Sequence, residues 1–362
     1  MRISKMLSGA NHYYQGVDIL GKVGREAADR GTKKALVLGG KHALDAAWES
    51  VKRGLEDSGI EYVLNIYEGF TTEADISALT ELYRQKSCNL VIGIGGGKIM
   101  DISKAVAAES GAPVFNVATS AATCACFAPL SVIYNNSGMQ EKIMFHDNEV
   151  DAVFVDLDII SGAPARLLAA GMADAMAKTC EYSTTHPSLQ YGDIDTAKYC
   201  GYRLAQAVDE ILLDCGAEAY QDVKNNKLSN ALEDAVFASI AVIGIVSGMC
   251  GYTNKPGGRF AIAHGFNEII RGRWEKDPRR FLHGELVAVG VLAQLYVNQM
   301  PNEHIDRVRN FYRSIEVPTT LHELGMDLDD GQLKCFQDEI INNTNIGCTH
   351  ETIIRYAIEQ VR

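Results

Sequence analysis

The sequence predicts a two-part α/β protein, with an N-terminal half built on a parallel sheet and an all-helical C-terminal half. Strand and helix patterns alternate up to about residue 160, an order typical of a parallel sheet covered by helices on both faces. After Gly162-Ala163-Pro164 the pattern is helical to the end of the chain. We therefore expect a boundary between residues 1–160 and residues 161–362.

The elements of the first half follow from hydrophobic periodicity. Strands are expected at 34–38, 61–67, 90–94 and 113–117, and helices at 19–29, 42–57, 74–86 and from Lys98 onward. Further strands are expected at 130–134, 140–145 and 152–156, the first two joined by a turn at 135–138 with the sequence Asn-Asn-Ser-Gly.

The second half shows six helical stretches. They are expected at 165–183, 189–213, 228–252, 284–299, 303–314 and 328–342. Residues 235–252 carry no charge, but serines and glycines interrupt them and no other stretch of this kind exists. We interpret this stretch as a buried core helix and not as a membrane span.

Composition places the chain among ordinary globular proteins. It has 362 residues, 47% of them hydrophobic, and a net charge of −12. The acidic balance argues against nucleic acid or an anionic membrane surface as a partner. The nine cysteines form no C-x-x-C pair, which favours reduced thiols, and the N-terminus lacks the apolar run of a signal peptide. We expect a cytoplasmic protein.

The glycine turn after the strand at 90–94 is a candidate anion site. Gly95-Gly96-Gly97 separates this strand from a helix that begins near Lys98. The first N–H groups of a helix lack internal partners, and its dipole adds positive charge there. The turn fits neither the ATPase phosphate loop nor G-x-G-x-x-G, because Lys98 stands where the third glycine should be. From the residues alone, a ligand loop and a plain tight turn stay open.

One aspartate and two histidines form a candidate metal site. Asp174 lies in an otherwise small and apolar helix, and His264 and His283 are each followed by glycine beside apolar stretches. Such a set supplies three ligands and one open position, as in catalytic zinc sites, and it also suits iron. The alternatives are core histidines held by hydrogen bonds and an Asp174 paired with Lys178 one turn on.

Taken together, the motifs resemble the glycerol dehydrogenase branch of the metal-dependent, or iron-containing, alcohol dehydrogenases. The resemblance runs over nearly the whole chain. Its most specific segments are Gly95–Ala105 (GGGKIMDISKA), Leu130–Tyr134 (LSVIY), Ala170–Ala175 (AGMADA), Ala263–Gly265 (AHG) and His283–Ala288 (HGELVA).

The resemblance implies a fold, two cofactors and their residues. The fold is a Rossmann-like dinucleotide-binding domain followed by a helical metal- and substrate-binding domain, as in glycerol dehydrogenase and dehydroquinate synthase. NAD or NADP would lie in the cleft, and a divalent metal, zinc or iron, would be bound by Asp174, His264 and His283. The positions that match nucleotide contacts are Gly40, Gly95, Gly96, Gly97, Lys98, Asp101, Thr119, Ser120, Ala121, Ala122, Leu130 and Tyr134. It also implies a homo-oligomer.

Cys124 departs from the pattern of glycerol dehydrogenases, which carry an aspartate there that contacts the polyol. A thiol accepts hydrogen bonds from a diol poorly, and the loss of a negative charge favours an anionic substrate. The surrounding segments 121–125 and 129–132 are similar to those of the hydroxycarboxylate dehydrogenase subgroup. The alternative is that Cys124 only packs and does not contact substrate.

A second departure concerns the choice of nucleotide. Relatives that prefer NAD often carry an aspartate where this chain has Gly40, followed by Lys41 and His42. Because no carboxylate would repel a 2′-phosphate there, we expect NADP to be accepted.

The expected function is hydride transfer between NAD(P) and a small secondary alcohol or ketone, foremost a 2-hydroxy acid and its 2-oxo acid. The alternative is a glycerol dehydrogenase. A lyase like dehydroquinate synthase would need Lys, Arg and Asn side chains that residues 118–129 do not offer. A cofactor-binding protein without catalysis is the third possibility, and no separate general base stands out.

Overall fold

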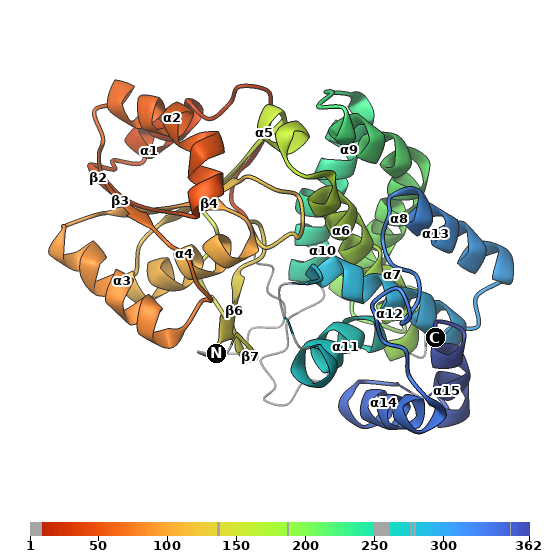
Figure 1. The fold of residues 1–362 in the computed structure, drawn as a ribbon. Coiled ribbons are helices and arrows are strands. Elements are labelled where there is room, and N and C mark those ends of the chain that lie inside the picture. Colours follow the sequence, from red (N-terminus) through yellow and green to blue (C-terminus); the bar gives the residue numbers. More distant parts are fainter. Residues whose placement is uncertain are drawn as a thin grey trace.

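A computed structural model describes residues 9–135, 138–186, 188–249, 261–275, 277, 280–347 and 349–362 of the chain. Figure 1 shows the larger sheet and the helices that cover it in the left part of the molecule, and a group of helices in the right part. In the described residues every named strand precedes Leu157, and every element from α5 onward is helical. The two-part fold class is therefore confirmed, while the residue boundary at 160/161 stays a prediction.

The larger sheet has six parallel strands in the order β1-β8-β5-β4-β2-β3. Their bounds are β1 Tyr13–Gly16, β2 Lys34–Gly39, β3 Glu61–Ile66, β4 Leu90–Gly95, β5 Val114–Ala118 and β8 Ala152–Asp156. The chain runs outward from β2 to β3, returns to β4 and then continues in the opposite direction. Ligands of open α/β sheets bind beyond the carboxyl ends of strands at such a reversal, here between β2 and β4.

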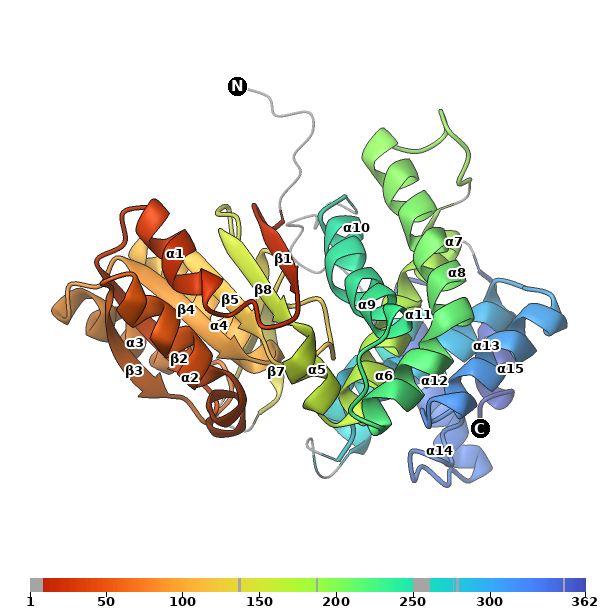
Figure 2. The ribbon, with the colours of Figure 1, turned by 90° about the horizontal axis from the view of Figure 1, so that it is seen from above.

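Two pairs of helices cover the faces of this sheet, as Figure 2 shows from above. The helices α1 (Lys22–Asp29) and α2 (Lys41–Asp57) bury one face, and α3 (Glu73–Gln85) and α4 (Gly97–Ser110) bury the other. In β2 alternate residues serve the two faces, so Val37 packs toward α2 and Leu38 toward α3 and α4. This covering of both faces explains why β4 and β5 are buried along their whole length and β2 is buried after its first residue.

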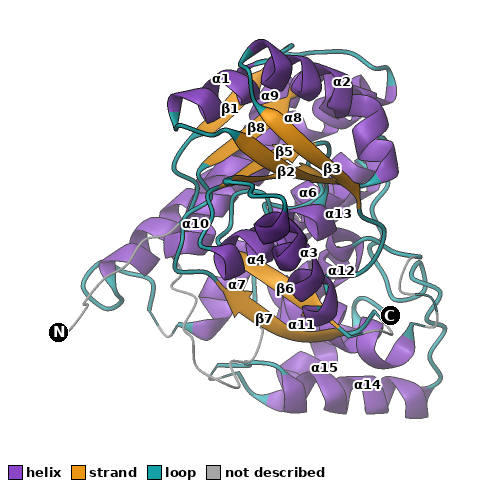
Figure 3. Ribbon diagram, turned by 90° about the vertical axis from the view of Figure 1, so that its left-hand side faces the viewer, coloured by secondary structure: helices purple, strands orange, loops and turns teal. Residues whose placement is uncertain are grey.

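A separate two-stranded antiparallel sheet lies beside α4 (Figure 3). It pairs β6 (Leu130–Tyr134) with β7 (Gln140–Phe145). The predicted strands are confirmed, and two residues of the predicted turn between them, at 136 and 137, lie outside the described residues.

The helical half is built around α12 (His283–Val297), of which 13 of 15 residues are buried. Its other helices are α5 Leu157–Gly162, α6 Ala165–Ala175, α7 Ala177–Thr185, α8 Thr196–Lys224, α9 Asn230–Phe237, α10 Ile243–Met249, α11 Ile262–Ile269, α13 Asn302–Ser314, α14 Asp330–Asn343 and α15 Glu351–Glu359, with two π-helical turns, η1 Ala238–Val242 and η2 Ile270–Trp274. A helix that is apolar on all sides is stable only when it is surrounded, and α12 contacts α6, α7, α11, α13 and α15.

Several element predictions were wrong in detail. The helix expected at 189–213 begins only at Thr196, behind the capping side chain of Asp195, and continues to Lys224. The stretch expected at 165–183 divides at Met176 into α6 and α7. The strand β1 and the helices α5, α11 and α15 were not predicted.

The apolar segment Asn230–Met249 is long and apolar enough to cross a membrane by length and composition alone. In the structure 67% of its most apolar window is buried against other parts of the protein, as in a core helix. Residues 250–252, the end of the uncharged stretch at 235–252, lie outside the described part of the chain.

Candidate metal and nucleotide site

Three helices supply the predicted metal ligands. Asp174 lies at the end of α6, His264 lies in the first turn of α11, and His283 is the first residue of α12. One ligand atom from each side chain lies within 4.8 Å of the others. Residues far apart in the sequence therefore converge at one point.

Glycines allow the ligand-bearing helices to approach this closely. A Cβ atom at Gly284 of α12 would lie 1.8 Å from the carbonyl oxygen of Ala170 in α6, and one at Gly290 would lie 2.4 Å from that of Ala263. Any side chain at either position would push α12 away from its neighbours. The glycine after His283 thus has a packing reason in this fold.

An ion pair fixes the start of α12 against α6. Arg166 donates to both carboxylate oxygens of Glu285, from Nε at 2.5 Å and from a terminal nitrogen at 2.7 Å. Glu285 also accepts from the backbone N–H of Leu282 at 2.8 Å, which satisfies one donor at the helix start. The same contact therefore holds the backbone next to His283.

The two histidine ligands face one carboxylate oxygen of the third ligand, Asp174. Nε2 of His264 lies 3.3 Å and Nε2 of His283 lies 3.4 Å from Oδ1 of Asp174. This oxygen is buried and accepts no hydrogen bond from the described residues. A buried oxygen without a partner is costly, and a cation between it and the two imidazoles would satisfy it.

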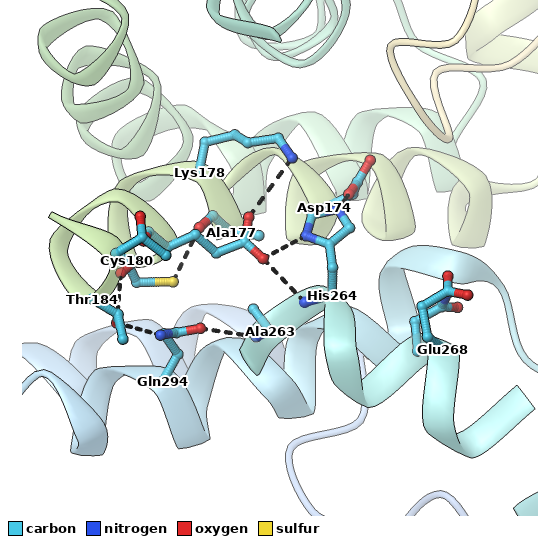
Figure 4. Close-up of polar contacts among 12 residues, drawn as sticks. Asp174, Ala177, Lys178, Cys180, Thr184, Ala263, His264, Glu268 and Gln294 are labelled. Atoms are coloured by element: carbon cyan, nitrogen blue, oxygen red, sulfur yellow. Dashed lines mark hydrogen bonds and ion pairs between the residues drawn. The ribbon is translucent and has the colours of Figure 1, made fainter. Parts of the chain in front are cut away.

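Glu181, which was not among the predicted site residues, orients His264, the ligand that Figure 4 shows close to Asp174. Its Oε1 accepts from Nδ1 of His264 at 2.7 Å and from the backbone N–H of the same residue at 3.1 Å. Because Nδ1 is engaged, Nε2 is the nitrogen left for a metal. The spacing of two helical turns from Asp174 was the available signal.

The charges of this cluster shift one another's pKa values. Burial raises the pKa of Asp174, but the imidazoles of His283 and His264 outweigh burial and hold it well below its usual range. Burial likewise opposes the ionised forms of His264 and Glu181, yet their mutual attraction raises the pKa of His264 to about 9 and, with Lys178, lowers that of Glu181 to about 2. Both carboxylates are thus ionised at neutral pH.

The donor set fits a divalent cation. Two imidazole nitrogens and one carboxylate oxygen suit zinc or iron, and three ligands leave a position for substrate. Nothing in this set distinguishes the two metals.

The glycine turn lies at the predicted crevice of the sheet. It joins β4 to α4, and Gly95, Gly96 and Gly97 line a small pocket together with Ser120, Thr123 and Ala118, the last residue of β5. The backbone N–H of Thr119 donates to the carbonyl oxygen of Gly95 at 3.1 Å. The structure thus brings the two predicted nucleotide loops, 95–98 and 119–122, side by side.

Two further predicted nucleotide contacts, Lys98 and Tyr134, both lie near the ring of Phe70. The ammonium of Lys98 lies 4.0 Å from the ring centre of Phe70, and that ring lies 5.4 Å from the ring of Tyr134. Gly40 follows the last residue of β2 and precedes α2, and the neighbour of a Cβ there among the described residues would be Ile99, at 3.9 Å. Gly40 thus lies against α4, the helix that follows the glycine turn.

Asp101 and Leu130 have other partners in the structure. The Asp101 carboxylate is buried and lies 3.4 Å from Nζ of Lys104. Lys104 in turn donates to the carbonyl oxygens of Ala125 at 2.7 Å, Ala128 at 2.9 Å and Leu130. This network fastens the loop after β5 to α4, so the described contacts of the Asp101 side chain are structural. Its role as a nucleotide contact stays a prediction that these contacts do not support.

Cys124 lies on that loop, facing the helical half. Its Sγ lies 3.9 Å from Oγ of Ser247 in α10. Burial, and after it the charge of Asp174, raises the pKa of the Cys124 thiol, which keeps it protonated at neutral pH. The loop also touches α6, because a Cβ at Gly171 would lie 1.7 Å from the carbonyl oxygen of Ala121. Cys124 therefore lies near the ligand cluster as a neutral group.

Comparison with known proteins places this architecture in a family. The family model "Iron-containing alcohol dehydrogenase" matches residues 10–158. The chain is 31% identical to glycerol dehydrogenase of Citrobacter freundii over 96% of its own length and 95% of that protein. It is also 31% identical to hydroxycarboxylate dehydrogenase A of Escherichia coli K12, over 83% of this chain and 80% of that protein.

The fold agrees with a solved structure described as a probable glycerol dehydrogenase from Sinorhizobium meliloti 1021. The TM-score is 0.82 at 24% identity, covering 99% of this chain and 98% of the other. The resemblance inferred from the motifs is thus confirmed. The chain belongs to the iron-containing alcohol dehydrogenase family, in its glycerol dehydrogenase branch, and is a nicotinamide-dependent dehydrogenase of alcohols.

Proposed function

We propose that this protein oxidises glycerol or a similar small polyol with NAD(P), using a divalent metal held by Asp174, His264 and His283. The convergence of these three side chains within 4.8 Å carries the proposal. The relatives named glycerol dehydrogenase, from Citrobacter freundii and from Thermotoga maritima at 34% identity over 77% of this chain, support this substrate class.

In this proposal the helical half holds the metal and the sheet half holds the nucleotide. When bound, the metal supplies Lewis acidity toward the substrate oxygen and the nicotinamide supplies the hydride acceptor. The chain positions the metal ligands. Glu181 fixes the ring of His264, and Arg166 with Glu285 fixes the backbone next to His283. The loops at 95–98 and 119–122, together with Gly40 and Tyr134, form the proposed nucleotide site on residues 1–160.

A second candidate substrate class, 2-hydroxy acids, has its own observation in support. Cys124, on the loop after β5, reaches Ser247 of the helical half with a neutral thiol, which is not an acidic group that could accept from a polyol. Hydroxycarboxylate dehydrogenase A is among the relatives, at the same identity as the glycerol dehydrogenase of Citrobacter freundii. The two candidates differ in whether the substrate carries a charge.

The test begins with dialysis against a chelator, followed by addition of zinc or iron(II). Reduction of NAD and of NADP is then followed with glycerol and with lactate. We expect no reduction without metal and restored reduction with it. Reduction that persists after complete metal removal would contradict the proposal. Binding of NAD without any alcohol oxidation would favour a protein without catalysis, and turnover of a phosphorylated substrate without net NAD reduction would favour a lyase.

A further inference from the structure

The helix that carries His264 has no capping side chain of its own. An N-cap side chain usually accepts from the backbone N–H groups two and three residues further along, but the N-cap residue of α11 is Ala261, which makes no such bond. The two N–H groups belong to Ala263 and His264, and each donates to a side chain of another helix. The start of α11 therefore depends on its neighbours.

Gln294 of α12 satisfies the first of these two groups. Its Oε1 accepts from the backbone N–H of Ala263 at 2.9 Å, and its side chain is fully buried. Figure 4 shows the Gln294 amide between Ala263 and Thr184, a residue of α7. Glu181, also of α7, accepts from the second group, at His264. Two helices thus share the capping of α11.

The Gln294 amide is held in one orientation by further hydrogen bonds. Its Nε2 donates to Oγ1 of Thr184, which donates to Oδ1 of Asn298. The amide nitrogen of Asn298 donates in turn to the carbonyl oxygen of Cys180 at 2.8 Å. Turning the Gln294 amide over would set two donors, Nε2 and the Ala263 N–H, against each other. Its Oε1 therefore stays directed at Ala263.

The helix that holds Ala263 also carries a metal ligand of its own. His283 begins α12, and Gln294 lies about three helical turns along it. One turn before Gln294, Gly290 lets α12 touch the carbonyl oxygen of Ala263, since a Cβ there would lie 2.4 Å from it. Because α12 contacts both the N–H and the carbonyl group of Ala263, it sets the position of the next residue, His264, relative to His283.

We infer that Gln294 is a positioning residue of the metal site, which fixes the start of α11 on α12 and thereby the separation of the ligand nitrogens of His264 and His283. This inference rests on the metal site of the function proposed above and extends it to a residue three turns from the ligand on α12. A helix start that is in place before the metal binds loses little conformational freedom on binding. Gln294 should therefore raise metal affinity as well as stability.

The experiment removes the Gln294 amide and measures metal binding directly. Metal-free wild type and Gln294→Met, a substitution that nearly preserves volume, are titrated with Zn²⁺ in competition with a chelator of known affinity. Both are also titrated with Co²⁺, whose visible absorption reports the geometry of its ligands. We expect Gln294→Met to bind Zn²⁺ about 10-fold or more weakly than the wild type and to show an altered Co²⁺ spectrum.

Gln337→Met is the matched control. Gln337 of α14 is also a buried glutamine, and its Nε2 donates to the carbonyl oxygen of Arg355 at 3.2 Å. Both variants should unfold at lower urea concentration than the wild type, because each loses a buried hydrogen bond. Gln337→Met should nevertheless keep the wild-type Zn²⁺ affinity and Co²⁺ spectrum.

Two further variants test the hydrogen bond to Ala263 itself. Gln294→Glu keeps an oxygen that can accept from the Ala263 N–H, so it should bind Zn²⁺ more tightly than Gln294→Met. If Gln294→Met does not fold, Gln294→Asn takes its place, because its shorter side chain withdraws the oxygen from Ala263 and leaves a polar group beside Thr184. The same loss of Zn²⁺ affinity is then expected.

The other results each overturn a stated claim. If Gln294→Met loses no more Zn²⁺ affinity than Gln337→Met, Gln294 contributes to stability alone and the inference is wrong. A Gln294→Glu variant that binds Zn²⁺ no better than Gln294→Met would also contradict it, since the bond to Ala263 would then have no part in metal binding. If the wild type itself binds neither Zn²⁺ nor Co²⁺, the metal site fails, and the proposed function fails with it.

Discussion

Oε1 of Glu181 accepts two hydrogen bonds from one residue, His264, through its ring Nδ1 and its backbone N–H. The carboxylate thereby sets both the position of the first turn of α11 and the orientation of the ring. A ligand orientation that depends on a neighbouring carboxylate is typical of metal sites.

Replacing Glu181 by Gln should weaken metal binding about 10- to 100-fold, because the amide holds the His264 ring less firmly and makes it a poorer ligand. The measurement is metal retained in competition with a chelator of known affinity. Glu316→Gln, at an exposed ion pair with Lys224, is the control and should bind metal as the wild type does. Equal metal affinity in both variants would contradict the orienting role.

Gly284→Ala should destabilise the protein by about 1–3 kcal/mol and lower its metal content, since the added Cβ would lie 1.8 Å from the Ala170 carbonyl oxygen. Denaturant unfolding and metal analysis measure the two effects. Gly162→Ala is the matched control, because a Cβ there meets no atom within 4 Å. Similar stability of the two variants would show that α6 and α12 can separate without cost.

Lys104→Met should cost about 3–5 kcal/mol, because it leaves the buried Asp101 charge and three carbonyl oxygens without their donor. Adding Asp101→Asn should recover part of that loss, since the unpaired charge disappears. Urea unfolding of both single variants and the double variant gives the coupling between the two residues. If the changes in the free energy of unfolding of the two single variants simply add in the double variant, Asp101 and Lys104 are not energetically coupled.

Gly40→Asp should move cofactor choice toward NAD. The position has room for a side chain, with only Ile99 within 4 Å, and a carboxylate there would repel a 2′-phosphate while accepting from a ribose hydroxyl. We expect the ratio of kcat/KM for NAD to that for NADP to rise about tenfold or more. Gly40→Asn, which has nearly the same shape without the charge, should change this ratio much less. A wild-type enzyme that rejects NADP outright would end the idea that NADP is accepted.

Asp209 of α8 should make stability fall with rising pH. Burial raises its pKa to about 8, although Thr179 opposes this in part, and its Oδ1 accepts no hydrogen bond from the described residues. The folded state therefore holds a proton that the unfolded state loses near pH 4, so its contribution is complete below pH 4 and is lost as pH rises toward 8. Each pH unit in that window costs at most about 1.4 kcal/mol.

Asp209→Asn should flatten that dependence, giving a gain in Tm over the wild type at pH 8 that shrinks toward pH 4. Thermal unfolding at a series of pH values measures the difference. The exposed Asp214→Asn on the same helix should leave the slope unchanged. A wild-type slope that persists in Asp209→Asn would assign it to another group.

Periodicity located most of the elements that carry the site, because long amphipathic or fully apolar segments leave a strong local pattern. It missed β1, whose four residues are only half buried at the sheet edge, and α11, whose eight residues are too few for a clear period. The ligands Asp174, His264 and His283 were identifiable by residue type, but their convergence depends on contacts between helices distant in sequence. Glu181 and Lys104 were not assigned, since the ring of His264 and the carbonyl oxygens of the loop after β5, with which they bond, come from other elements.

The contact between Gly171 and the Ala121 carbonyl has a consequence for how the two halves meet. It leaves no space between the helix that carries Asp174 and the loop that precedes Cys124. The helical half and the sheet half are therefore in direct backbone contact at this point, with no side chain between them. A residue with a side chain at 171 would have to displace the loop before Cys124, and it would thereby separate the ligand-bearing helix from the glycine-rich half of the site.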